Sequence, residues 1–183
     1  MKKKIVIIAS AIVVLLLIAA AAILYPLMYK GTDQIVIVEN QKFTTLDQIL
    51  KQDFLNNKTV VVDMWGTYCS PCIKEFDNAA QLKAQFKNKP VEFLYLCTVE
   101  RIDHKLRWKK IIQDKQLNGY HIAIDSEELF DDIWNNYLSD PVEGKYMIPR
   151  YFIVKNGEVV VSNAQQPSSK ELLYNQIDSV LNL

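Results

Sequence analysis

Cysteine is scarce in this 183-residue chain, and its three residues are too few for a scaffold held together by disulfides. Glycine and proline are also sparse, at 5 and 6 residues, while half of the chain is hydrophobic, which excludes a disordered or low-complexity protein. Neither sign of charge is in excess, since 21 basic residues balance 21 acidic ones. We therefore expect no nucleic-acid partner, and the length predicts one ordinary domain.

The first 29 residues differ in composition from the rest, because they hold three lysines and almost nothing else polar. An apolar run extends from Ile5 to Tyr29 and is broken only by Ser10 and Pro26. As a helix this run would span roughly 37 Å, which exceeds the bilayer core of about 30 Å. Lysines precede the run and none follows until Lys30, so we expect the N-terminus inside and the domain outside the cytoplasmic membrane.

Two alternatives compete with this transmembrane anchor. The alanines at 19–22 offer an A-x-A site for cleavage of a signal peptide, although the apolar region of such peptides is usually shorter. The second alternative is that the apolar run forms a helix buried in a protein core. With the anchor retained, the predicted division is a cytoplasmic basic stub at 1–4, a single-pass anchor at 5–29, a linker at 30–34 and a folded extracytoplasmic (periplasmic) domain at 35–183.

Beyond the linker, short β-branched runs alternate with amphipathic segments. The expected strands are 35–38, 59–63, 91–98, 120–124, 151–155 and 158–162. The expected helices are 45–50, one from the second cysteine to about 86, 103–116, one capped by Ser126, and a last one with Ser168 and Glu171 as a capping box. Asn156-Gly157 predicts a hairpin between the last two strands. This order predicts an α/β fold with a mixed central sheet flanked by helices.

The segment Cys69-Ser70-Pro71-Cys72 lies between an expected buried strand and an expected helix, where C-x-x-C is typical of a redox dithiol. At a helix N-terminus, free N–H groups stabilise a thiolate on Cys69. Cys72 would lie one turn further in and be shielded. The asymmetry predicts that Cys69 attacks and Cys72 resolves. Pro71 falls in the first turn, where its missing N–H costs nothing.

Two other interpretations of the cysteines compete with this one. A structural zinc site needs four ligands, and the chain has only one further cysteine, Cys97, and two histidines, His104 and His121, without ligand spacing. A structural disulfide closing so short a loop would contribute little stability. We therefore expect no metal and no cofactor, and Cys97 to be a buried thiol. Acidic residues at 125–132 suit the start of a helix, and the basic residues at 105–115 a solvated face or a contact with an acidic partner or anionic lipid.

The stretch from Val62 to Cys72 reads V-D-M-W-G-T-Y-C-S-P-C and resembles the active-site segment of the thioredoxin-like family. Its W-G-T-Y-C-x-P-C form, followed by K-E-F, is similar to the membrane-anchored TlpA/ResA-like branch. Ile148-Pro149 matches the position where the family holds a cis-proline that faces the dithiol. The resemblance covers about 35–183 and implies a thioredoxin-like fold, with about 101–120 as extra material.

The resemblance also implies roles for single residues. Asp63 stands six residues before Cys69, where thioredoxins keep a buried acid that exchanges a proton with the second cysteine. The alternative is an acid in solvent at the end of a strand. Ile148 and Pro149 would present backbone to an extended substrate segment. Trp65 and Tyr68 would form walls of the substrate site or, equally, be plain packing.

The expected function is that of a thiol-disulfide oxidoreductase. The resemblance implies that it reduces disulfides of exported proteins, such as clients of cytochrome c maturation, with electrons from a membrane donor. The inner pair Ser70-Pro71 resembles that of reducing relatives more than that of oxidising ones, so a thiol oxidant is the alternative. A non-enzymatic copper chaperone of the same fold is another, although such proteins use C-x-x-x-C. The peroxidase pattern P-x-x-x-T-x-x-C fails at Val62 and Gly66.

Overall fold

The computed structural model describes residues 10, 12–21, 24, 34–39, 41–99, 101–138 and 146–183. The chain forms two compact units, Met1–Lys30 and Gly31–Leu183. In the first unit residues 12–21 are helical, and within the described residues no helix is both long and apolar enough to cross a membrane. The predicted stub at 1–4, most of the linker at 30–34, and both ends of the anchor at 5–29 lie outside the described residues.

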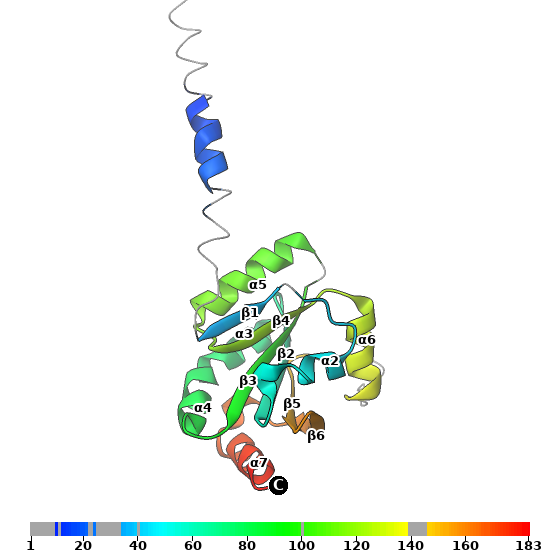
Figure 1. Cartoon of the computed structure of the whole chain (residues 1–183). Helices are drawn as coiled ribbons and strands as arrows, with labels where there is room; N and C mark the ends of the chain where they lie inside the picture. The colour runs from blue at the N-terminus through cyan, green and yellow to red at the C-terminus, as the bar shows by residue number, and fades with distance from the viewer. Residues whose placement is uncertain are drawn as a thin grey trace, which may run out of the picture. The chain divides into compact units, whose positions relative to one another are not determined.

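The second unit is built on one six-stranded sheet with the strand order β1-β4-β3-β2-β5-β6 (Figure 1). The strands are β1 (Ile35–Val38), β2 (Thr59–Gly66), β3 (Val91–Thr98), β4 (Gly119–Ile124), β5 (Arg150–Lys155) and β6 (Glu158–Ala164). The first four strands pair in parallel, whereas β5 runs antiparallel to β2 and forms the predicted hairpin with β6. The prediction of a mixed α/β sheet is therefore confirmed.

Helices cover both faces of this sheet. They are α2 (Leu46–Leu50), α3 (Ser70–Glu75), α4 (Ala79–Phe86), α5 (Ile102–Asp114), α6 (Glu127–Asn136) and α7 (Glu171–Leu181). Alternation along β2 divides the core: Val60 and Val62 pack with the apolar sides of α2 and α6, while Val61 packs under α4 and α7 and Trp65 under α3 and α5. Every residue of β2 is buried, as its apolar run predicts.

Two predicted helix boundaries need correction. The helix expected to run from Cys72 to about Phe86 is divided into α3 and α4 by a 3-10 turn, Phe76–Asn78. The predicted capping box of Ser168 and Glu171 is wrong, because the chain enters α7 through another 3-10 turn, Pro167–Ser169, and Lys170 precedes the helix at a φ of +45°. The Ser126 side chain does cap α6, by accepting the N–H of Leu129.

Gly119 opens β4 at a φ of +130°, where a Cβ would lie 2.6 Å from the backbone oxygen of Phe93. Gly119→Ala should lower the free energy of unfolding by about 2–4 kcal/mol, because strained backbone is combined with a clash against a paired strand. Gly157→Ala is the matched control: its φ is +82°, but its Cβ would meet nothing within 4 Å, so a loss of about 1 kcal/mol is expected. Equal losses in urea denaturation would contradict this account.

Candidate active site

Cys69 and Cys72 are joined by a disulfide at the start of α3, directly after the end of β2. Cys69 is the N-cap residue of the helix, and its Sγ lies 3.2 Å from the backbone N of Cys72 and accepts that N–H. Pro71 occupies the first turn. Cys72 is fully buried, whereas Cys69 is partly exposed. The difference in access that the sequence predicts for the two sulfurs is therefore present.

The peptide bond between Ile148 and Pro149 is cis, and the Ile148 carbonyl oxygen lies 3.7 Å from Cys69 Sγ. The Ile148 side chain packs at the end of β2, where a Cβ on Gly66 would lie 3.0 Å from Ile148 Cδ1. The structure thus brings together the two segments that the sequence singled out, although they are 79 residues apart. An extended chain lying along the Ile148 backbone would pass directly beside the exposed sulfur.

The two aromatic residues before Cys69 lie in different surroundings. Trp65 is fully buried, and its ring packs edge-on against Phe76 with centroids 4.9 Å apart. Trp65 was left open between a wall of the substrate site and plain packing, and the structure corrects the first alternative: its side chain leaves β2 towards the helices and belongs to the core. Tyr68 is 62% exposed next to the disulfide and remains accessible to a substrate.

Asp63 is buried in the middle of β2, in register with Tyr95 on β3 and Tyr151 on β5. The pKa of Asp63 is raised to about 8, mainly by burial and also by the charge of Glu75, against the opposing effects of Tyr151 and Lys83. Its Oδ1 atom has no hydrogen-bond partner among the described residues. The alternative of a solvated acid at the strand end is therefore wrong, and Asp63 can exchange a proton near neutral pH.

Glu75 is a second buried acid that the sequence analysis missed. It lies three residues after Cys72 on α3 and borders, with Asp63, a cavity of about 10 Å³ under the helix. Its Oε2 accepts the N–H of Ser168 at 2.8 Å, which explains why this N–H takes no part in a capping box. The signal available in the sequence was an acid one turn after Cys72, next to Phe76 on the apolar side of the helix.

Arg107 is the other missed residue. Its Nε donates to the Thr67 carbonyl oxygen at 2.9 Å, and its guanidinium lies 4.6 Å from the centre of the Tyr68 ring. The His104 ring also contacts the Tyr68 ring, with the two ring centroids 5.0 Å apart. Helix α5 therefore places positive charge beside the dithiol. The sequence analysis expected the basic residues of this helix to face solvent or a partner. The contact of Arg107 with Thr67 and Tyr68 is a tertiary one and cannot be read from the sequence.

The remaining candidates have structural surroundings. Cys97 is buried on β3, and burial raises the pKa of its thiol well above the usual range. His121 is fully buried, with Nε2 at 2.7 Å from the Leu117 carbonyl oxygen, and burial lowers its pKa to about 3. Throughout the described part of the chain, no group of three or more His, Cys, Asp or Glu residues is arranged to hold a metal ion.

Comparisons with known proteins show to which family this chain belongs. The sequence pattern of the Redoxin family covers residues 30–181. The chain belongs to the Redoxin family. Thiol-disulfide oxidoreductase ResA of Bacillus cereus is 27% identical over 118 residues, which are 64% of this chain and 61% of that protein. These two matches confirm the resemblance to thioredoxin-like proteins of the ResA type that the motif predicted.

A second curated relative is a replication protein of Onion yellows phytoplasma, 30% identical over 106 residues, which are 51% of this chain and 27% of that protein. The Redoxin chain thus spans less than two thirds of the length of either curated relative.

Solved structures share the fold. The thioredoxin domain of a thiol-disulfide oxidoreductase from Bacteroides vulgatus has a TM-score of 0.54 and 22% identity, covering 69% of this chain and 81% of that one. A thiol:disulfide interchange protein from Bacteroides sp. has a TM-score of 0.51 and 22% identity, covering 69% and 75%. At this identity the likeness shows the fold alone, and that fold is thioredoxin-like.

Proposed function

We propose that this Redoxin-family protein is a membrane-anchored, extracytoplasmic thiol-disulfide oxidoreductase that reduces disulfides of exported proteins. The observation that carries the proposal is the disulfide between a partly exposed Cys69 and a fully buried Cys72, with the Ile148 carbonyl oxygen 3.7 Å from the exposed sulfur. One sulfur can meet a substrate, the other can meet only the first, and the Ile148 backbone can align the substrate chain. The similarity to ResA of Bacillus cereus supports the same reaction.

The reaction begins with the dithiol form. The Cys69 thiolate attacks one sulfur of a substrate disulfide, the substrate bond breaks, and one substrate sulfur leaves as a thiolate. The Cys72 N–H is positioned to donate to the Cys69 thiolate before attack, and Arg107 adds positive charge nearby. Cys72 then attacks Cys69 Sγ and releases the second substrate thiol. Two electrons have passed to the substrate, and the protein holds the disulfide seen in the structure.

Resolution requires the buried Cys72 thiol to lose a proton, and we assign its acceptance to Asp63, the buried acid whose raised pKa suits the task. A carboxyl group with a pKa of about 8 is near the middle of its titration at physiological pH, so it can both accept and return a proton. Glu75 borders the same cavity and lies on the helix turn that follows Cys72. This cavity of about 10 Å³ is close to the room that one water needs. A water there can carry a proton between the carboxyl groups of Asp63 and Glu75.

The cellular setting follows from the N-terminal sequence and the compartment. Three lysines followed by a 25-residue apolar run favour an anchor with the domain outside the cytoplasm. That side of the membrane is oxidising, so a reductase there needs electrons delivered through a membrane partner. Clients of cytochrome c maturation fit the ResA-type similarity, because their cysteines must be reduced for haem attachment. A thiol oxidant is the competing direction for the same dithiol.

One labelling experiment tests location and direction together. Intact spheroplasts are treated with a membrane-impermeant maleimide before lysis, and the label added to the partly exposed Cys69 is measured by gel shift. A reductase outside the cytoplasm should be labelled, because its dithiol is kept reduced. If Cys69 is labelled only after lysis, the location is wrong. If it reacts only after chemical reduction of intact spheroplasts, the location stands and the protein is an oxidant. Cys97 is buried and serves as the internal unlabelled control.

A further inference from the structure

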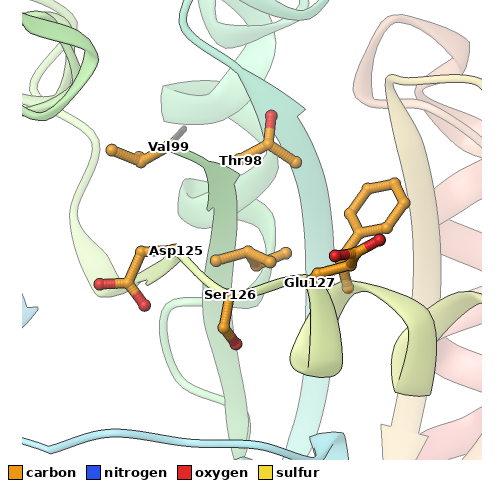
Figure 2. Close-up of a pocket in the computed structure, with 7 residues that line it drawn as sticks. Thr98, Val99, Asp125, Ser126 and Glu127 are labelled. Carbon is orange, nitrogen blue, oxygen red and sulfur yellow. The ribbon is translucent and has the colours of Figure 1, made fainter. Parts of the chain in front are cut away.

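A pocket of about 250 Å³ opens at the ends of β3 and β4, where α6 begins (Figure 2). Figure 2 shows Thr98 and Val99 at the end of one strand, and Asp125, Ser126 and Glu127 on the turn that follows the neighbouring strand. The pocket is also lined by Ile124 and Phe130. Its volume is large enough for one long side chain, and its floor is apolar.

The pocket lies beside the dithiol. Thr98 Oγ1, Ile148 Cδ1 and Cys69 Cβ all lie within 4 Å of one point, the position of a Cβ on Gly66. Phe130, on another side of the pocket, contacts the segment that precedes Ile148. Its ring packs edge-on against Tyr146, two residues before Ile148, with centroids 5.2 Å apart. A chain extended along the Ile148 backbone rises about 3.3 Å per residue, so a side chain within two residues of its reacting cysteine reaches this pocket.

The charge on the pocket has one sign. Its two charged lining residues are Asp125 and Glu127, both exposed, and no lysine or arginine is among those that line it. The sequence from 117 to 144 holds seven acidic residues and neither lysine nor arginine. Asp125 also lines a second, small cavity together with Lys105, whose positive charge partly offsets the negative charge of Asp125. The negative potential at the pocket therefore comes mainly from Glu127. An aliphatic stem with a cationic end fits this combination of apolar floor and acidic rim.

We propose that this pocket selects protein substrates that carry a lysine or arginine within two residues of the reacting cysteine. The inference rests on the proposed function, since it concerns the substrate of the same dithiol. Glu127 is the main specificity residue and Asp125 a weaker one. The cation of the substrate lies at the carboxylates while its stem covers Phe130 and Val99. Attraction between exposed charges acts mostly on the encounter, and it weakens as salt is added.

The test uses the full chain in detergent, reduced beforehand, and octapeptides whose single cysteine is held as a mixed disulfide with 2-mercaptoethanol. Lys, Gln or Glu is placed at each position within two residues of the cysteine, and the second-order rate of peptide thiol release is measured. At least one position should favour Lys over Glu, by about two- to fivefold for each contributing carboxylate. Glu127→Gln should remove most of that ratio and Asp125→Asn a smaller part.

Glu128→Gln is the matched control, because it makes the same change in the same helical turn outside the pocket lining, and it should keep the ratio. Equal rates for the Lys and Glu peptides at every position would overturn the pocket proposal. So would an equal loss in Glu127→Gln and Glu128→Gln, which would indicate general attraction to an acidic surface. Reduction of bis(2-hydroxyethyl) disulfide by the unmodified protein separates the two proposals: if that reaction also fails, the proposed function itself is wrong.

Discussion

Cys69→Ser should abolish disulfide exchange, leaving less than about a thousandth of the activity, because a serine hydroxyl is not ionised at neutral pH and cannot form a mixed disulfide. Cys72→Ser should fail in a different way. Cys69 remains partly exposed and can still attack, but the buried partner that would release it is missing. Mixed disulfides with substrate proteins should therefore accumulate on Cys72→Ser, and a non-reducing gel of isolated membranes displays them.

Cys97→Ser is the control for both variants. Its thiol is buried on β3 in register with Trp65, and it should change neither turnover nor the adducts, at the expense of some packing stability. Adducts on Cys69→Ser and none on Cys72→Ser would reverse the assignment of attacking and resolving cysteine. Adducts that depend on Cys97 would refute its structural role. The partners trapped on Cys72→Ser can be identified by mass spectrometry, which also supplies natural sequences for the pocket proposal.

The central features of the fold were predictable because they depend on local patterns. The apolar run that becomes β2, the C-x-x-C at its end and the Asn156-Gly157 turn each have a physical meaning within a few residues. The Ile148-Pro149 position was found only through family resemblance, since nothing local links it to a dithiol 79 residues away. Its place beside Cys69 follows from β5 pairing with β2, a long-range contact.

The misses share another cause, which is that they depend on tertiary contacts. Glu75 reads as an ordinary helical acid until the approach of Ser168 and Asp63 encloses it. Arg107 reads as one of several basic residues until α5 docks on Thr67. Trp65 was equally compatible with a site wall or with packing, and strand alternation alone did not say which face of β2 the helices α3 and α5 would cover. Burial of polar groups is therefore where sequence reasoning was weakest.

Asp63→Asn should slow exchange at neutral pH by at least about tenfold, because the buried Cys72 thiol loses the group that accepts its proton. The pH profile distinguishes this role from a structural one. In the unmodified protein the rate should rise as Asp63 ionises and level off above its pKa of about 8. In the variant the rate should keep rising beyond that pH, since only ionisation of the thiol by solvent remains. Rapid-mixing measurements from neutral to alkaline pH provide both curves.

The same substitution should make the protein more stable relative to the unmodified chain as the pH rises. The folded-state pKa of Asp63, about 8, lies above the ordinary value of 3.8, so between these values the folded state holds a proton that the unfolded state has lost. The stability of the unmodified protein therefore falls across this range, by about 1.4 kcal/mol for each pH unit. From about pH 4 to about pH 7 the free energy of unfolding of Asp63→Asn should gain about 4 kcal/mol on the unmodified protein.

Comparing the two proteins at each pH removes the constant cost of burying an amide, which does not change with pH. Asp131→Asn is the matched control, because Asp131 is exposed on α6 and the substitution should leave the difference from the unmodified protein flat with pH. Urea denaturation at several pH values measures all three proteins. A flat difference for Asp63→Asn as well would mean that folding does not raise the pKa of the carboxyl group. Asp63 would then be too weak a base to take the proton of a buried thiol, and the relay through Asp63 would be wrong.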